Sequence, residues 1–362
     1  MAFWIFTINP GSTSTKTALF CDLNCVFEST VRHDATELQR LHSLSAQLPL
    51  RLQRIEQDLE AALRQAGLPG LESVDAFVGR GGLLKSLPSG TYQINPAMLD
   101  DLTQSRYGVH ASNLGAPIAF GLAAHHEKLA LIVDPVSVDE MIPLARYSGL
   151  PQFRRRSTFH ALNQKATARK ACTALACDYQ QVNLIIAHLG GGISVAAHRK
   201  GLVIDVNNAL EEGPFSPERA GTLPTLQMLD YLETKQATLA ELRTLLVGRG
   251  GLYAYTGTAD AKAVEDAAAS DPHKAEILQA MAYQISKWIG AMATVLHGEV
   301  RAIVLTGGLA YSSLLTQAVT AAVDFIAPVL IFPGENEMQA MAEGAYRVLA
   351  GQEAVRHYAP EA

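Results

Sequence analysis

Apolar and polar positions alternate in blocks along the chain, and these blocks predict strands, turns and helices. Residues 3–8 are nearly all apolar, and they lead into a turn of proline, glycine and hydroxyl residues at 10–15. Residues 17–20 leave this turn as a second β-rich run. Residues 183–195 repeat the pattern around a glycine triplet. The pattern therefore predicts one β-hairpin in each half of the chain.

The two hairpins are part of a larger internal repeat. Asn9 and His188 occupy the same position relative to the glycines of their turns. In each half a short buried strand then ends in Gly-Gly, at residues 76–82 and at residues 302–308. Two likenesses in the same order predict duplicated domains.

Between these turns the apolar positions recur at helical spacing. One stripe runs from Leu52 to Leu63 and stops at Gly67, and a second consists of the leucines between 226 and 246 and stops at Gly248. Both stripes are predicted to face the core. Two short buried strands and a last helix are also predicted, at residues 129–134, 329–332 and 337–349.

This alternation predicts an α/β fold in which mixed sheets are flanked by helices and ligands bind at the carboxyl ends of strands. The first domain is placed at residues 1–178 and the second at residues 179–337, with a C-terminal helix at 338–362 packing back on the first. If the two domains face each other, both glycine turns lie at one cleft suited to a nucleotide.

Composition narrows the class of protein. The chain has 362 residues, 48% hydrophobic and 18% charged, with a net charge of −6, so a nucleic-acid or anionic-membrane surface is not expected. The short apolar N-terminus lacks a basic leader and is predicted to be a strand, and no stretch approaches the ~20 apolar residues of a membrane span. The four cysteines fit neither a disulfide scaffold nor the usual zinc spacing. These features predict a cytoplasmic protein with reduced thiols.

The first hairpin turn carries the clearest candidate chemistry. It presents backbone N–H groups, hydroxyls and the Lys16 ammonium to one small volume, which suits phosphate oxygens; the alternative is a solvated polar turn. A Walker A loop is disfavoured, because Thr15 replaces its second glycine and β-branched residues follow where a helix should begin.

Several other polar side chains stand beside glycines or at predicted strand and helix ends, and phosphoryl transfer needs such positioned cations and donors. They are Arg80, Asp134, His160, His188, Arg219, Glu335 and Glu337. For each a structural role is the alternative: a surface salt bridge, a helix cap or a core hydrogen bond. The basic triplet at residues 154–156 is interpreted as part of a loop, and no catalytic role is assigned to it.

At this point the chain resembles a known family. Residues 9–16, 133–135 with 155–163, 187–195 and 305–311 are similar to signatures of the acetate and butyrate kinase family. Residues 78–84, 110–115 and 213–224 resemble its butyrate kinase branch in particular. The motifs span nearly the whole chain in family order.

The resemblance implies a member of the acetate and sugar kinase/Hsp70/actin superfamily, with two duplicated actin-like, ribonuclease H-like domains around a nucleotide cleft. It also implies site roles. Asn9, Ser14 and Lys16 would hold phosphate oxygens and help place the metal, and His188, Gly190, Gly307 and Gly308 would hold or approach the nucleotide.

The remaining roles concern the transfer itself. Arg80 and Arg219 would clamp the carboxylate and the moving phosphoryl group, to which His160 would donate. Asp134 would orient the arginine and the metal's hydration shell, and Glu337, with Glu335 as the alternative, would contact Mg²⁺.

The implied reaction is ATP plus a short-chain carboxylate giving ADP and an acyl phosphate, reversibly and with Mg²⁺. Butyrate is the preferred acid, with acetate, propionate and isobutyrate as alternatives. Two other readings remain: a kinase of a hydroxyl acceptor with Asp134 as base, and a non-catalytic ATP-binding protein. A homodimer or higher homo-oligomer is implied, without nucleic-acid or membrane partners.

The chain departs from the family pattern at two places. The loop at residues 208–213 is one residue shorter than usual, which leaves the pose of Arg219 open. Ala259 stands where asparagine is expected, which concerns a local turn.

Overall fold

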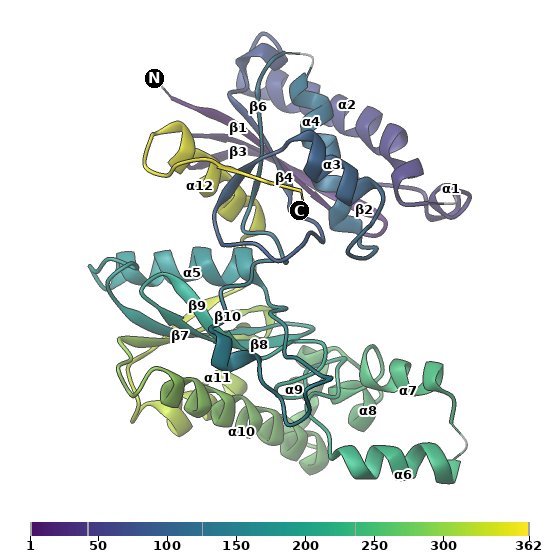
Figure 1. The fold of residues 1–362 in the computed structure, drawn as a ribbon, viewed down its shortest axis with the longest axis vertical. Coiled ribbons are helices and arrows are strands. Elements are labelled where there is room, and N and C mark those ends of the chain that lie inside the picture. The colour runs from purple at the N-terminus through teal and green to yellow at the C-terminus, as the bar shows by residue number, and fades with distance from the viewer. Residues whose placement is uncertain (1, 42, 125, 236, 361–362) are drawn as a thin grey trace. The chain divides into compact units, whose positions relative to one another are not determined.

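The chain divides into two compact units, each built on one mixed β-sheet flanked by helices (Figure 1). The computed structural model describes residues 2–41, 43–124, 126–235 and 237–360. The first unit comprises Met1–Val138 and Asn336–Ala362, and the second comprises Asp139–Glu335. The predicted α/β class is confirmed.

The first unit contains a seven-stranded sheet in the order β12-β5-β6-β4-β1-β2-β3. Its strands are β1 Trp4–Pro10, β2 Ser14–Cys21, β3 Asn24–Arg32, β4 Ala76–Arg80, β5 Thr91–Gln93, β6 Leu129–Val133 and β12 Arg356–His357. Its helices are α1 Ala35–Gln39, α2 Leu48–Ala66, α3 Pro96–Thr103, α4 Gly115–Ala124 and α12 Glu337–Leu349, with short 3₁₀ turns η1 Ser45–Gln47, η2 Leu71–Ser73 and η3 Ala111–Leu114.

The second unit contains a five-stranded sheet in the order β11-β10-β7-β8-β9. Its strands are β7 Asn183–Leu189, β8 Ile193–Arg199, β9 Leu202–Val206, β10 Ala302–Gly307 and β11 Val329–Pro333. Its helices are α5 Ala161–Ala174, α6 Thr225–Lys235, α7 Leu239–Leu246, α8 Gly251–Thr256, α9 Ala261–Ala268, α10 Pro272–Val295 and α11 Ser313–Val323, with 3₁₀ turns η4 Pro143–Arg146 and η5 Gly308–Tyr311.

The internal repeat predicted from the glycine turns is present in the strand order. Strands β3-β2-β1-β4-β6 of the first sheet have the same succession as β9-β8-β7-β10-β11 of the second. In both, an antiparallel hairpin is followed by two parallel strands on its inner side. The two hairpins thus occupy equivalent places in duplicated units.

The second sheet is buried on both faces, which explains why β7 is apolar throughout. Ile185, Ala187 and Leu189 face a core shared with α10 and α11, whereas Leu184 and Ile186 face α5. Figure 1 shows α5 and α10 on opposite faces of this sheet. Successive strand residues point to opposite faces, so a strand covered twice needs apolar residues at every position.

The first sheet is covered in the same manner. Helices α2 and α4 contact each other and pack on its strands, and α12 crosses β1, β4 and β6 on the other face (Figure 1). The predicted stripe on α2 is confirmed, since Ile55, Leu59 and Leu63 are buried. The helix ends at Gly67, whose φ of 69° lies in the left-handed region.

The boundary between the units differs from the one placed at residue 178. Helix α5 precedes that residue but packs on β7 and β10, so it belongs to the second unit, which begins at Asp139. The last helix predicted at residues 337–349 is confirmed, whereas the domain assignment that extended it over 338–362 is too long. The helix ends at Leu349, because the backbone turns at Gly351 with a φ of 69°, and the short strand β12 then pairs with β5.

The leucine stripe between 226 and 246 was predicted to face the core, and this prediction is wrong. None of the described residues of α6 and α7 is buried; Leu226 is 76% exposed and Leu239 is 69% exposed. The two helices lie at the periphery of the second unit, away from its sheet (Figure 1), and residues of both line one open hollow. Helical periodicity identifies an apolar face but not what covers it.

Among the helices of the described ranges, none combines the length and the apolar character needed to cross a bilayer.

Candidate active site

The first hairpin places three predicted phosphate-binding side chains, those of Asn9, Ser14 and Lys16, at or beside its turn. Strands β1 and β2 pair so that Asn9 lies opposite Lys16, and the turn closes through a hydrogen bond of 2.7 Å from Gly11 N to Ser14 O. Lys16 is exposed and Ser14 is half-buried. The turn therefore offers an ammonium and a hydroxyl close to the solvent, as its sequence predicts.

Arg51, a buried arginine that was not predicted from the sequence, hydrogen-bonds to the backbone of this turn. Arg51 on α2 is fully buried, and its guanidinium donates to Gly11 O at 2.9 Å and to Ser12 O at 2.7 Å. It also reaches Thr15 Oγ1 at 3.3 Å and Gln47 Oε1 at 3.0 Å. All these acceptors are uncharged, and burial lowers the pKa of the Arg51 guanidinium. The signal was present, because Arg51 is one helical turn before Ile55 on the buried stripe.

His33 extends this buried network and makes stability depend on pH. Its Nε2 lies 2.9 Å from Thr15 Oγ1, and burial, with help from Arg51 and Arg54, lowers the pKa of His33 from 6.5 to about 4. The unfolded chain therefore binds this proton more readily than the folded one. We expect the free energy of unfolding to be constant above pH 6.5 and to fall as the pH drops from 6.5 to about 4.

Urea denaturation at a series of pH values measures this dependence, and His33→Gln is the comparison. The variant should lose part of the slope between pH 6.5 and about 4. An identical slope in both proteins would assign the effect to other groups.

Three predicted site residues of the first unit meet at the end of β4. Glu337, the first residue of α12, accepts hydrogen bonds from Asn9 Nδ2 at 2.5 Å and from Arg80 Nη1. The Arg80 side chain is 12% exposed and that of Glu337 is 23% exposed, so the pair is partly shielded from water. Residues far apart in the sequence thus form one cluster.

The glycines around Arg80 have a packing role rather than the role of clearing space for its guanidinium. A Cβ on Gly79 would lie 2.2 Å from Gly115 O, one on Gly81 would lie 2.4 Å from Pro135 Cβ, and one on Gly82 would lie 2.6 Å from Asn113 Oδ1. These close approaches fix where β4 ends.

Asp134 follows β6 directly and is held in place by its neighbours. Its Oδ1 accepts hydrogen bonds of 2.8 Å from Ser89 Oγ and from Gly90 N, and the residue is 2% exposed. The carboxylate therefore ties the end of β6 to the segment that precedes β5.

In the second unit the two predicted histidines form a stacked pair. The rings of His160 and His188 lie 3.7 Å apart between centroids with an interplanar angle of 15°. His160 is the residue before α5, and its Nδ1 lies 2.9 Å from Ser194 Oγ. His188 Nδ1 lies 2.8 Å from Asn163 Oδ1, and its Nε2 lies 3.0 Å from Glu335 Oε1. The two acidic residues considered for the metal therefore have different surroundings: Glu337 pairs with Arg80 and Glu335 with His188.

Arg219 lies against the glycine turn of the second hairpin. A Cβ on Gly192 would be 1.9 Å from Arg219 Nη1, so only glycine leaves room for this guanidinium. Nη1 donates to Ala209 O at 2.9 Å, and Ser216 Oγ donates to Gly191 O at 2.6 Å. The shortened loop at 208–213 thus holds the arginine through Ala209. Burial lowers the pKa of Arg219, opposed by the nearby Glu218 carboxylate.

The three glycines predicted to accommodate the nucleotide differ in their surroundings. Gly307 has a φ of 89°, and a Cβ there would lie 2.4 Å from Leu189 O, so strand packing already requires glycine. A Cβ on Gly190 would lie 2.9 Å from His188 Nε2. By contrast, a Cβ on Gly308 would meet nothing within 4 Å, which leaves space for a ligand to approach its backbone.

The arginine triplet has no catalytic geometry. Arg155 binds the Glu212 carboxylate at 2.9 Å, Asp205 at 3.1 Å and the backbone oxygen of Val206 at 3.0 Å, while Arg154 and Arg156 are exposed. Arg155 therefore fastens its loop to β9 and to the loop that carries Ala209.

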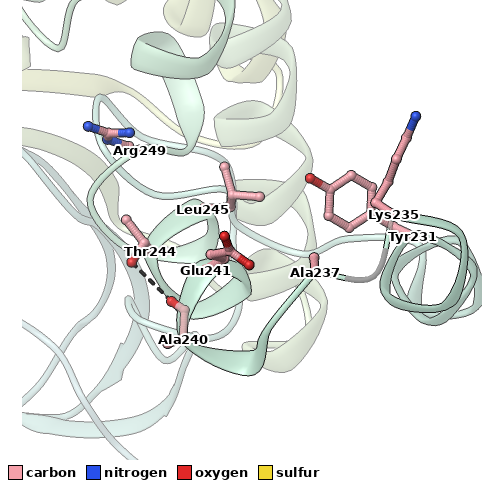
Figure 2. Close-up of a pocket in the computed structure, with 8 residues that line it drawn as sticks. All are labelled: Tyr231, Lys235, Ala237, Ala240, Glu241, Thr244, Leu245 and Arg249. Carbon is pink, nitrogen blue, oxygen red and sulfur yellow. Dashed lines mark hydrogen bonds between the residues drawn. The ribbon is translucent and has the colours of Figure 1, made fainter.

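Residues of α6, of α7 and of the segments beside them line a separate hollow of about 480 Å³. Figure 2 shows the side chains that line it. Tyr231 points from α6 toward α7, and Lys235 points away. Its lining is Tyr231, Lys235, Ala237, Ala240, Glu241, Thr244, Leu245 and Arg249. None of the predicted site residues belongs to it, so it is not the candidate site.

Comparison with known proteins decides the family. A model of the acetokinase family matches residues 144–344. A curated relative from Coprothermobacter proteolyticus, described as a probable butyrate kinase, is 52% identical over 361 residues, which are 99% of this chain and 100% of that protein. The chain belongs to the acetokinase family. A second probable butyrate kinase, from Listeria welshimeri, is 47% identical over 360 residues, again 99% of this chain and 100% of the relative.

The fold agrees with this membership. The crystal structure of Porphyromonas gingivalis acetate kinase superposes with a TM-score of 0.78, covering 96% of this chain and 100% of that one at 18% sequence identity. The acetokinase family recognised in the sequence motifs is thus confirmed, and so is the predicted duplication of the two units.

Proposed function

We propose that this acetokinase family member transfers the γ-phosphoryl group of ATP to a short-chain carboxylate, with butyrate as the preferred acid, and forms ADP and an acyl phosphate reversibly. The observation that carries the proposal is the similarity, over 99% of the chain at 52% identity, to a probable butyrate kinase.

The cations and hydrogen-bond donors of the two units support this reaction. A short-chain fatty acid has a pKa of about 4–5, close to that of glutamate, so it is already an anion at neutral pH and needs no general base. The difficulty is to bring this anion to an anionic phosphate. Lys16 and Arg80 in the first unit and His160, His188 and Arg219 in the second are suited to that task, provided that both units act on the same nucleotide.

The roles of individual residues are part of the proposal. Arg80 and Arg219 would bind the carboxylate and the transferring phosphoryl group, because a guanidinium can donate two parallel hydrogen bonds to either. His160 would donate to the same phosphoryl oxygens, and Lys16 and Ser14 would bind the phosphate chain. Gly308, whose surroundings are open, would allow the nucleotide to approach the backbone.

Magnesium is compatible with the residues present. Asn9 and Glu337 are neighbours joined through the Asn9 amide nitrogen, and each side chain also carries an oxygen, which is the ligand type that Mg²⁺ takes. The described residues contain no cluster of three or more histidine, cysteine, aspartate or glutamate side chains that could hold a metal ion. When bound, Mg²⁺ would offset the negative charge of the phosphates.

A hydroxyl acceptor is disfavoured by the geometry around Asp134. Such an acceptor needs a base, and Asp134 was the candidate. Its Oδ1 already accepts two hydrogen bonds that join β6 to the segment before β5. This structural engagement supports an acceptor that arrives deprotonated.

Hydroxylamine trapping tests the proposed reaction. The purified protein is incubated with ATP and Mg²⁺ and with acetate, propionate, butyrate, isobutyrate or glucose, and the acyl phosphate is measured as its hydroxamate beside released ADP. We expect equal amounts of the two products and the highest kcat/KM for butyrate. Each methylene removed should cost about 10- to 200-fold.

Two results would contradict the proposal. Release of ADP with glucose but without hydroxamate would indicate a hydroxyl acceptor. Binding of ATP without turnover of any acid would indicate a non-catalytic protein.

The similarity to probable butyrate kinases also supports two proposals about the whole protein, namely a cytoplasmic location and assembly into a homodimer or a multiple of it.

A further inference from the structure

A series of hydrogen-bonded side chains within the second unit runs from Tyr179 to the Nδ1 atom of His160. Tyr179 Oη lies 2.7 Å from His198 Nδ1, and His198 Nε2 lies 3.0 Å from Gln164 Oε1. Gln164 Nε2 donates to Ser194 Oγ at 2.8 Å, and Ser194 Oγ lies 2.9 Å from His160 Nδ1. Gln164, Ser194 and His198 are all fully buried, so no solvent competes with these hydrogen bonds.

The amide of Gln164 gives this hydrogen-bonded series its direction. Gln164 Nε2 also donates to the backbone oxygen of Ser194 at 3.0 Å. A carbonyl oxygen only accepts, so the nitrogen of the amide must face Ser194 and its oxygen must face His198. His198 Nε2 therefore carries a hydrogen.

The contacts of His198 and Tyr179, at the end of the hydrogen-bonded series away from His160, agree with this direction. Burial, and then the charges of Lys165 and Arg169, lower the pKa of His198 well below its usual value, so His198 is neutral with a single ring hydrogen. With that hydrogen on Nε2, Nδ1 accepts from the hydroxyl of Tyr179.

The near end determines the state of His160. Ser194 Oγ accepts from Gln164, and in the part of the chain that the structure describes its hydroxyl has no acceptor besides His160 Nδ1. Because a buried hydroxyl hydrogen needs an acceptor, Ser194 donates to Nδ1. Neutral His160 then carries its own hydrogen on Nε2.

The stack with His188 fixes the plane of the His160 ring, and the hydrogen bond to Ser194 fixes which edge of the ring faces Ser194. A half-turn of the His160 ring within the stack would bring Cδ2 instead of Nδ1 to Ser194 and lose the hydrogen bond. His188 is itself held by Asn163 through its Nδ1.

We propose that Gln164, acting through Ser194, sets the tautomer of His160 so that Nε2 carries the hydrogen that is donated to the phosphoryl group during transfer. Gln164 and Ser194 are thus positioning residues for the reaction. The proposal rests on the function proposed above, which assigns this donation to His160.

The tautomer can be measured without turnover. In the full chain labelled with ¹⁵N-histidine, long-range ¹H–¹⁵N correlation NMR distinguishes protonated from unprotonated ring nitrogens, and the His160→Gln variant identifies the signal of His160. We expect an unprotonated Nδ1 and a protonated Nε2. A hydrogen on Nδ1 would overturn the inference and leave the proposed reaction untouched.

Variants then test whether Gln164 is responsible. Gln164→Met keeps the length of the side chain and removes its donors, and Ser194→Ala removes the hydroxyl. Gln227→Met, on the exposed face of α6, is the matched control for the same chemical change. In both test variants we expect a mixture of the two His160 tautomers and a kcat lowered about tenfold, which corresponds to the loss of about one hydrogen bond. KM for ATP and for butyrate should stay nearly unchanged, and the control variant should behave like the parent.

A purely structural role would give a different outcome. If Gln164→Met and Ser194→Ala lowered the melting temperature but left the tautomer of His160 as in the parent, Gln164 would not set it. If instead the tautomer shifted as expected while His160→Gln retained full turnover, the inference on the ring would hold and the catalytic role assigned to His160 would fail.

Discussion

Replacing Arg219 with alanine should lower kcat for acyl phosphate formation by about 10²- to 10³-fold, because one preformed donor to the transferring phosphoryl group is lost. The structure favours this residue because its guanidinium is partly buried against Gly192, and burial lowers the pKa of Arg219 in the absence of substrates. A bound anion would offset that desolvation. Hydroxamate production under saturating substrates measures the effect.

Stability should respond little to the same change. The Arg219 side chain donates a hydrogen bond to Ala209 O, and removing a partly buried cation relieves part of its desolvation cost. Arg249→Ala removes an exposed arginine from the same unit and should keep normal turnover. Arg219→Lys should not restore activity, because an ammonium cannot form the bidentate contact. Turnover of Arg219→Ala within threefold of the parent would refute the role.

The duplicated fold could be predicted because its signals are local. A glycine-containing turn between two apolar runs defines each hairpin, and a strand ending in Gly-Gly follows at the same relative place in both halves. Strands β1 and β7 and their partners occupy equivalent positions in the two sheets, as expected. Turn chemistry and side-chain alternation act over a few residues, so one sequence is enough to read them.

Signals that depend on packing partners were read less well. The leucines of α6 and α7 have the spacing of a core-facing helix, yet Leu226 and Leu239 are exposed because no sheet lies over them. The end of α12 was visible as Gly351, but which segments then pair as β12 and β5 depends on the assembled sheet. A pattern of period 3.6 shows which residues share one face of a helix, but it does not show which distant segment of the chain packs on that face.

In the candidate site, too, some residues could be predicted from local sequence signals and others could not. Arg80, His160, His188 and Arg219 stand beside glycines or helix ends, and the resemblance to a family named them directly. The residues behind them were not predicted. Gln164 lies inside α5, and only the packing of that helix on the sheet of the second unit brings its amide to Ser194 of β8. Its function is set by neighbours distant in sequence.

Arg51 is the clearest such case, and replacing it with methionine should lower the free energy of unfolding by about 2–4 kcal/mol. The change leaves the oxygens of Gly11 and Ser12 without the donor that now joins them, whereas Thr15 keeps its contact with His33. Each acceptor left unpaired in a shielded place costs about 1–3 kcal/mol, and loss of the desolvation cost of Arg51 offsets part of that sum. The same turn also carries Ser14 and Lys16, so KM for ATP should rise with the loss of stability. Urea denaturation and steady-state kinetics measure the two effects.

Arg54→Met is the matched control for Arg51→Met, since Arg54 is on the same helix but its side chain is 32% exposed and pairs at the surface with Glu37. Its loss should cost at most about 1 kcal/mol and leave KM unchanged. Arg51→Lys separates charge from geometry, because a single ammonium cannot reach both Gly11 O and Ser12 O as the planar guanidinium does. If the lysine variant matched the parent in both measurements, charge alone would support the turn. If Arg51→Met were as stable as Arg54→Met, the buried arginine would have no part in shaping the first phosphate-binding hairpin.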